Sequence, residues 1–231
     1  MSEKGYIIDT PQLDVYQQMA MDEYFCERMP YKYILRFYNW KENAITFGFS
    51  QRYNQIIEKL PVEDRELSIT RRPTGGGIVF HKNDLTFSFL FYSPGIFNPH
   101  QTYESLHKAI SEAFSEKGIF LEILNSKTSN YNVNDPVMDC FSKPVEKDLM
   151  IGSKKILGGA LRKFSDYMLY QSSLQIENAR KNDVYRESIK NAMIKLHLIT
   201  FEEYKIEKKD LEIIDKIAYN KYRSKDWINR I

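Results

Sequence analysis

Between residues 70 and 88 the chain combines residue types that can bind an anionic ligand. Arg71 and Arg72 come first, and three consecutive glycines follow shortly after them. A guanidinium group binds a carboxylate or a phosphate through paired hydrogen bonds. Glycine has no β-carbon, so a ligand can lie directly against the backbone. Three glycines alone are typical of a solvent-exposed hairpin, but beside the two arginines they indicate a binding loop formed by Gly75, Gly76 and Gly77.

The residues that follow the glycines indicate strands that hold this loop rigidly. Positions 78–80 and 85–92 are rich in β-branched and aromatic residues, which favour strands. The pattern differs from the G-x-G-x-x-G of a dinucleotide-binding fold. It is not a P-loop either, because no Gly-Lys-Ser/Thr opens a helix here. The loop is therefore predicted to carry another kind of binding site.

A second glycine-rich stretch, residues 148–163, places Lys155 between two glycine turns. Folding does not require a lysine there, and a lone lysine is normally a solvated charge. A cation placed where an oxyanion develops contributes strongly to the catalysis of acyl transfer. Successive short strands are predicted at 149–151, 155–157, 161–164 and 168–176.

Cys140 lies in a polar segment, residues 125–145, that we interpret as a long loop. With Cys26 it makes two cysteines, too few for a disulfide framework or a C-x-x-C metal site. Cys26, at the end of an amphipathic segment, is interpreted as a packed small hydrophobe. For Cys140 a structural role stays open, but its polar flanks fit a nucleophile, which nearby cations such as Lys155 would activate.

Composition excludes several classes of protein. The 231 residues carry a net charge of +2, with 33 basic and 31 acidic side chains, which does not favour nucleic-acid binding. No apolar run approaches the length of a membrane span, and the first residues do not resemble a signal peptide. We therefore expect no nucleic-acid or membrane partner and a cytoplasmic location with reduced thiols.

The order of predicted elements indicates an α+β fold with mixed, mostly antiparallel sheets flanked by helices. After a strand at 5–9 and a helix to residue 27, residues 33–40 and 44–49 are predicted to form a hairpin. Further helices are predicted at 53–60, 102–118, 182–196, 209–219 and 224–230. Residues 1–231 are interpreted as a single domain, with a short helical C-terminal extension from about residue 200.

Two motifs together resemble the lipoate/octanoate branch of the biotin/lipoate attachment superfamily. Residues 71–81 read R-R-x-T-G-G-G-x-V-x-H, and residues 152–160 read G-x-x-K-I-x-G-x-A. The resemblance implies the catalytic-domain fold of that superfamily and a lysine, Lys155 rather than Lys154, that contacts the acyl carbonyl. It also implies a set of substrate-binding residues: Arg71, Arg72, Gly75, Gly76, Gly77, His81, Asp84, Gly158 and Ala160.

The resemblance extends to Cys140. One class of octanoyltransferase in this superfamily carries its nucleophile as C-F-x-x-P, and residues 140–144 read C-F-S-K-P. This implies an acyltransferase that attaches an octanoyl or lipoyl group to the lysine of a lipoyl domain, with Cys140 and Lys155 as catalytic residues. The donor would be an acyl carrier protein or an acylated H protein. The acceptor would be a dehydrogenase E2 lipoyl domain or the glycine-cleavage H protein. Neither a metal nor a cofactor would be required, and the strands around Val79 and Phe89 would form the acyl tunnel.

The main alternative is a lipoate-protein ligase that uses ATP and Mg²⁺ to form lipoyl-adenylate. Arg71 and Lys155 would then hold the adenylate, and Cys140 would be incidental. Many such ligases need an accessory domain that the residues after Leu196 are too few to supply. A degenerate homologue that only binds acylated lipoyl domains is less favoured, because the glycines, His81 and Lys155 are intact. A biotin ligase is also less favoured, because both motifs have the form of the lipoyl branch.

Overall fold

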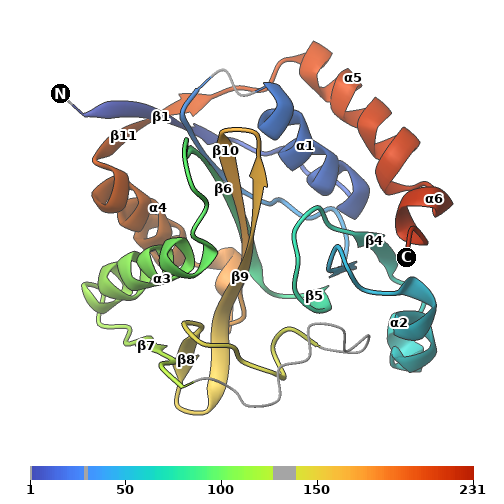
Figure 1. Cartoon of the computed structure of the whole chain (residues 1–231), viewed down its shortest axis with the longest axis horizontal. Coiled ribbons are helices and arrows are strands. Elements are labelled where there is room, and N and C mark those ends of the chain that lie inside the picture. The colour runs from blue at the N-terminus through green and yellow to red at the C-terminus, as the bar shows by residue number, and fades with distance from the viewer. Residues whose placement is uncertain (1, 29–30, 127–138) are drawn as a thin grey trace.

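The computed structural model describes residues 2–28, 31–126 and 139–231, and it contains two sheets with helices packed against them (Figure 1). The strands are β1 (Glu3–Ile8), β2 (Tyr33–Phe37), β3 (Ala44–Phe47), β4 (Ser68–Arg71), β5 (Val79–His81), β6 (Leu85–Tyr92), β7 (Glu122–Ile123), β8 (Leu149–Ile151), β9 (Lys154–Phe164), β10 (Tyr167–Leu174) and β11 (Ile199–Tyr204). The α-helices are α1 (Val15–Arg28), α2 (Tyr53–Lys59), α3 (Pro99–Ser115), α4 (Asp183–His197), α5 (Lys208–Ile217) and α6 (Lys225–Ile228).

The larger sheet has eight strands in the order β11-β1-β2-β6-β10-β9-β8-β7. Its pairs are parallel at the β11-β1-β2 edge and antiparallel from β2 to β7. The smaller sheet has the order β4-β3-β5, with one parallel and one antiparallel pair. The predicted α+β fold with mixed, mostly antiparallel sheets is therefore confirmed.

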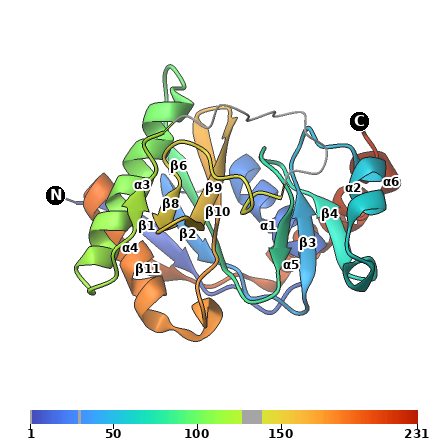
Figure 2. The same ribbon diagram turned by 90° about the horizontal axis from the view of Figure 1, so that it is seen from below.

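Helices cover both faces of the larger sheet. In Figure 2, α3 and α4 lie on one side, whereas α1 and the smaller sheet lie on the other. Successive side chains of a strand point to opposite faces, so Phe87, Phe89 and Phe91 of β6 pack into the core beneath α3 and α4. The polar Thr86 and Ser88 alternate with them and hydrogen-bond to Trp40 and Asp22 on the opposite face. This alternation gives the face toward the smaller sheet its polar character.

The predicted hairpin between residues 33–40 and 44–49 is wrong. β2 lies in the larger sheet between β1 and β6, whereas β3 belongs to the smaller sheet between β4 and β5. Nearly every residue of both strands is buried, so each needs neighbours on both edges and both faces. The connection between them carries the chain from one sheet to the other, and its Trp40 packs into the core beside α1.

Other boundaries also differ from the sequence-based prediction. The strands expected at 155–157 and 161–164 are one continuous strand, β9, in which Gly158 and Gly159 stay paired with β10. Helix α1 begins at Val15 rather than near residue 10, because the Asp14 carboxylate accepts hydrogen bonds from the first helical N–H groups. Helix α3 begins at Pro99 rather than at residue 102, and Asn98 caps it.

Strand β11 was not predicted at all. It pairs with β1 along six residues and extends the larger sheet at its parallel edge. Its sequence, I-T-F-E-E-Y, includes two adjacent exposed glutamates, Glu202 and Glu203, which weakened the strand signal. Within the described residues, no helix combines the length and apolar character needed to cross a membrane.

Candidate active site

A pocket lies between the two sheets, and it brings the two glycine-rich stretches together. The smaller sheet contributes Thr46 and Val79, and the larger sheet contributes Gly158, Gly159 and Ala160. Met19 of α1 and Phe141 add apolar surface. Arg72, His81 and Cys140 also line this pocket, so five of the predicted site residues are brought to one place: Arg72, His81, Cys140, Gly158 and Ala160.

Backbone pairing between two distant segments positions Cys140. Asp139 forms a bridge with Ile78, at the start of the strand after the glycine loop, and the Cys140 N–H donates to the Ile78 carbonyl at 2.9 Å. The thiol then lies beside Gly76, where an added β-carbon would come within 3.6 Å of Cys140 Sγ. Residues 127–138 of the predicted loop lie outside the described residues. The nucleophile predicted from sequence is therefore placed against the glycine loop.

Lys155 reaches the same point from β9. Its Nζ lies 3.9 Å from Cys140 Sγ and 2.8 Å from an oxygen of Asp148, and the residue is only 3% exposed. Gly158 makes room for it, because a β-carbon at that position would lie 2.1 Å from Lys155 Cε. Gly158 therefore leaves space for the Lys155 side chain and also forms part of the pocket wall.

The replacement Gly158→Ala should displace Lys155 and lower the rate of acyl transfer by about 100-fold, the loss expected for a misplacement of about 1 Å. Because the clash involves the end of a flexible side chain, the fold should survive. Initial rates and circular dichroism measure the two effects. Ser153→Ala, in the exposed turn just before β9, is the matched control. A Gly158→Ala enzyme with the native rate would contradict this packing argument.

The structure does not bring Arg71 into the pocket. Its guanidinium is buried and donates to the carbonyls of Phe49, Gln51, Trp227 and Ile228 at 2.6, 2.7, 3.0 and 2.8 Å. Burial, with a smaller contribution from Arg230, lowers the pKa of Arg71 to about 10. In this arrangement Arg71 joins the C-terminal segment to the strand before the glycine loop.

Arg72 shapes the glycine loop itself. Its guanidinium donates to the carbonyls of Gly75 and Gly77, each at 2.7 Å, and to the Thr46 hydroxyl at 3.2 Å. Gly76 has a φ of +88°, which side chains rarely adopt, and its carbonyl packs against Gly48. The pocket lining therefore does not include Gly75, Gly76 or Gly77. These glycines instead contact Arg72 and Cys140, which do line the pocket.

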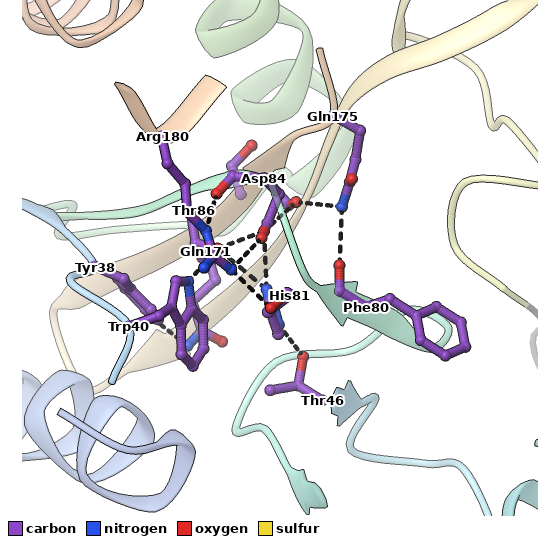
Figure 3. Close-up of polar contacts among 12 residues, drawn as sticks. Tyr38, Trp40, Thr46, Phe80, His81, Asp84, Thr86, Gln171, Gln175 and Arg180 are labelled. Carbon is purple, nitrogen blue, oxygen red and sulfur yellow. Dashed lines mark hydrogen bonds and ion pairs between the residues drawn. The ribbon is translucent and has the colours of Figure 1, made fainter. Parts of the chain in front are cut away.

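His81 and Asp84 form a buried polar cluster at the pocket wall (Figure 3). The ring nitrogens of His81 lie 2.8 Å from Asp84 Oδ2 and 2.9 Å from Thr46 Oγ1, and the ring stacks on Trp40. Asp84 also accepts from Ser173. Burial acts to raise the pKa of Asp84, but His81 and the hydroxyl donors outweigh it and hold the pKa below its usual value. His81 thus joins both sheets around the pocket.

Phe89, expected in the acyl tunnel, faces the other side of the sheet, in the core beneath α3 and α4. The reason is the alternation along β6, which directs odd-numbered positions away from the smaller sheet. Val79 does line the pocket. Met19 of α1 and Phe141 complete the apolar lining.

A buried charge network beneath the pocket was also missed. Asp22 of α1 and Arg36 of β2 are both fully buried and form an ion pair, and Gln171 donates to Asp22 at 2.7 Å. Gln171 in turn accepts from the Thr74 hydroxyl of the glycine loop at 2.6 Å. The available signal was an arginine within the otherwise apolar run Y-I-L-R-F, which a buried strand tolerates only with a partner.

His107 of α3 supports the opposite side of the site. Its two ring nitrogens lie 2.7 Å from the Lys147 carbonyl and 2.7 Å from the Tyr170 hydroxyl, and the ring packs on Tyr103. Burial lowers the pKa of His107 to about 3, and burial also lowers the pKa of His197 to about 4. Both histidines are therefore neutral in the folded protein at neutral pH.

These pKa values predict acid-sensitive stability. The unfolded chain, with histidine pKa values near 6.5, takes up protons before the folded protein does. The stabilisation is therefore complete above about pH 6.5 and is lost as pH falls toward the folded values. We expect the free energy of unfolding to fall by about 1.4 kcal/mol per pH unit for each histidine in that window. Denaturant titrations at several pH values measure it, and His107→Gln should reduce the slope. An identical slope in His107→Gln would contradict the prediction.

Comparison with known proteins identifies the family. The family model "Lipoyl protein ligase A/B catalytic domain" matches residues 14–202, which include every predicted site residue. The chain belongs to this family. The octanoyltransferase LipM of Staphylococcus epidermidis is 27% identical over 183 residues, 75% of this chain and 66% of the relative. LipM of Bacillus subtilis is 23% identical over 258 residues, covering 90% of this chain and 92% of the relative.

Solved structures of the lipoyl protein ligase A/B type share the fold. A bi-partite lipoate protein ligase from Thermoplasma acidophilum superposes with a TM-score of 0.75 at 18% identity, covering 98% of this chain and 96% of that chain. At this low identity the similarity shows that the two proteins share a fold.

The match to LipM of Staphylococcus epidermidis covers slightly less than two thirds of that relative's length.

Proposed function

We propose that the protein is an acyltransferase that attaches an octanoyl or lipoyl group to the lysine of a lipoyl domain through a thioester at Cys140. One observation carries the proposal: Cys140 Sγ lies 3.9 Å from Lys155 Nζ, beside a partly apolar pocket. Reactive cysteines of enzymes lie in partly exposed positions beside a cationic side chain, as Cys140 does. The similarity to proteins named octanoyltransferase LipM supports the same reaction.

The reaction would proceed in two half-reactions. The Cys140 thiolate attacks the carbonyl carbon of a donor thioester, the bond from that carbon to the donor sulfur breaks, and the donor leaves as a thiolate that takes up a proton from water, so that a thioester forms on Cys140. The neutral amine of the acceptor lysine then attacks this thioester. An amide forms, and the Cys140 thiol is released. In both steps the Lys155 ammonium would stabilise the oxyanion, and the acyl chain would lie against Met19, Val79 and Phe141.

The partners in this proposal are proteins. The donor would be an acyl carrier protein or an acylated H protein, and the acceptor would be the lipoyl domain of a dehydrogenase E2 subunit or the glycine-cleavage H protein. The Thermoplasma structure was reported together with its E2 lipoyl domain, which supports an acceptor of this type. The reaction would take place in the cytoplasm and would require no cofactor.

The alternative is an ATP-dependent lipoate-protein ligase. The structural similarity to such a ligase supports this alternative. ATP and Mg²⁺ would activate lipoate, Lys155 would hold the adenylate phosphate, and Cys140 would be dispensable. The pairing of Cys140 with Lys155 favours the transferase, because a ligase has no use for a thiol at that position.

A single assay separates the two functions. The purified protein is mixed with a lipoyl domain and either octanoyl carrier protein without ATP, or free lipoate with ATP and Mg²⁺. The mass of the lipoyl domain is then followed with time. Octanoylation without ATP supports the transferase. Modification only in the second mixture would overturn it in favour of the ligase.

A further inference from the structure

Asp148 is a buried carboxylate in direct contact with the candidate catalytic lysine. Asp148 is fully buried, and its Oδ2 lies 2.8 Å from Lys155 Nζ and accepts from the Val145 N–H at 2.7 Å. Its Oδ1 accepts from the Tyr103 hydroxyl at 2.6 Å. A carboxylate withdrawn from water needs a cation or several donors, and here it has both.

These contacts fix the orientation of the Lys155 side chain. Lys155 has four rotatable side-chain bonds, yet its side chain is only 2% exposed and passes over Gly158. At the end of that path, Nζ lies 2.8 Å from Asp148 Oδ2 and 3.9 Å from Cys140 Sγ. The ammonium thus contacts a fixed negative charge and the thiol at the same time.

Helix α3 in turn fixes Asp148. The Tyr103 hydroxyl donates to Asp148 and accepts from the Gly159 N–H at 3.0 Å, which links the carboxylate to β9. Burial, with the neighbouring Asp148 charge, raises the pKa of Tyr103 well above its usual value, so this hydroxyl remains a donor. Other polar groups around the cluster are His107, whose ring packs against Tyr103, and Tyr170.

We propose that Asp148 is a positioning residue that holds the Lys155 ammonium within reach of Cys140, so that the three side chains act as one unit. The inference rests on the proposed function. It adds a residue that lies outside the two family motifs at residues 71–81 and 152–160. Asp148 would act only through Lys155, and its neutral analogue would remove the negative charge that contacts the lysine.

A double-mutant cycle with a chemical probe tests this unit without any acyl donor. Iodoacetamide alkylates cysteine thiolates, and intact mass with peptide mapping separates Cys140 from the buried Cys26. We expect Asp148→Asn to slow alkylation of Cys140 by about 10-fold, because the Lys155 ammonium would no longer be held beside the sulfur. In the Lys155→Met background the same replacement should change the alkylation rate by less than about 2-fold, because the effects of replacing two groups that act as a unit are not additive.

The outcomes are separable. Equal factors in the native and Lys155→Met backgrounds would show that Asp148 acts independently of the lysine, which overturns the inference. A coupled cycle in a protein that transfers no octanoyl group would instead overturn the proposed function. Glu146→Gln, which removes a carboxylate two residues away that pairs with Lys147 and His100, is the matched control and should alkylate at the native rate.

A second variant tests the inference if the Asp148→Asn protein does not fold. Tyr103→Phe keeps the Asp148 carboxylate but removes the hydrogen bond to its Oδ1. Alkylation of Cys140 should slow by about 3-fold, again only when Lys155 is present. Circular dichroism confirms that each variant is folded. A Tyr103→Phe effect that persists undiminished in Lys155→Met would overturn the inference.

Discussion

The Cys140→Ala protein should transfer acyl groups at least about 1,000-fold more slowly than the native protein, because loss of a covalent nucleophile removes the whole two-step route. The fold should be unaffected, since the Cys140 backbone N–H still donates to the Ile78 carbonyl. Initial rates of octanoyl transfer to a lipoyl domain, with carrier-bound donor and no ATP, measure the loss.

The other cysteine provides the control. Cys26 is buried in α1, and burial raises its pKa well above the usual value, so it is an inert thiol. Cys26→Ala should keep the rate within about 2-fold, although removing a packed sulfur lowers stability modestly. A Cys140→Ala protein with native rates would refute the thioester mechanism, and equal losses in both variants would point to a structural effect.

Replacement of Asp22 by alanine should destabilise the fold by about 3–5 kcal/mol, because it leaves the Arg36 guanidinium buried without its counter-ion. Both side chains are completely buried. Asp22 also accepts hydrogen bonds from Ser88 at 2.7 Å and from Gln171 at 2.7 Å. Its loss therefore leaves several donors unsatisfied in the layer beneath the pocket.

Urea unfolding followed by circular dichroism measures this change. Asp166→Ala, an exposed aspartate in the turn between β9 and β10, should alter stability by less than about 0.5 kcal/mol. The double replacement Asp22→Leu with Arg36→Met should recover much of the loss, because an apolar pair of similar volume can replace a buried ion pair. A loss below about 1 kcal/mol in Asp22→Ala would contradict the assignment of this network.

The sequence grouped three distant segments chiefly through the family resemblance. By their residue types alone, Lys155 could have been a solvated charge and Cys140 a structural cysteine. The structure places Lys155 against Cys140 and Cys140 against Gly76. Glycine within a strand often marks the close approach of another group, and Gly158 beside Lys155 is such a case.

The residues whose positions were predicted wrongly have partners that are far away along the chain. Arg71 looks like a ligand-binding arginine in its own motif, but its acceptors include carbonyls 156 and 157 residues later. The pairing of Asp22 with Arg36, and of β11 with β1, follows from the same kind of long-range packing. Local periodicity contains no information about these contacts, which explains why the hairpin at 33–49 was predicted between strands of different sheets.

The central claim is a covalent acyl-enzyme on Cys140. The most direct measurement is the intact mass of the protein after brief mixing with octanoyl carrier protein, without ATP and without acceptor. The account predicts a gain of one octanoyl group that hydroxylamine removes and that peptide mapping places on Cys140. An unchanged mass, or an adduct on another residue, would contradict it.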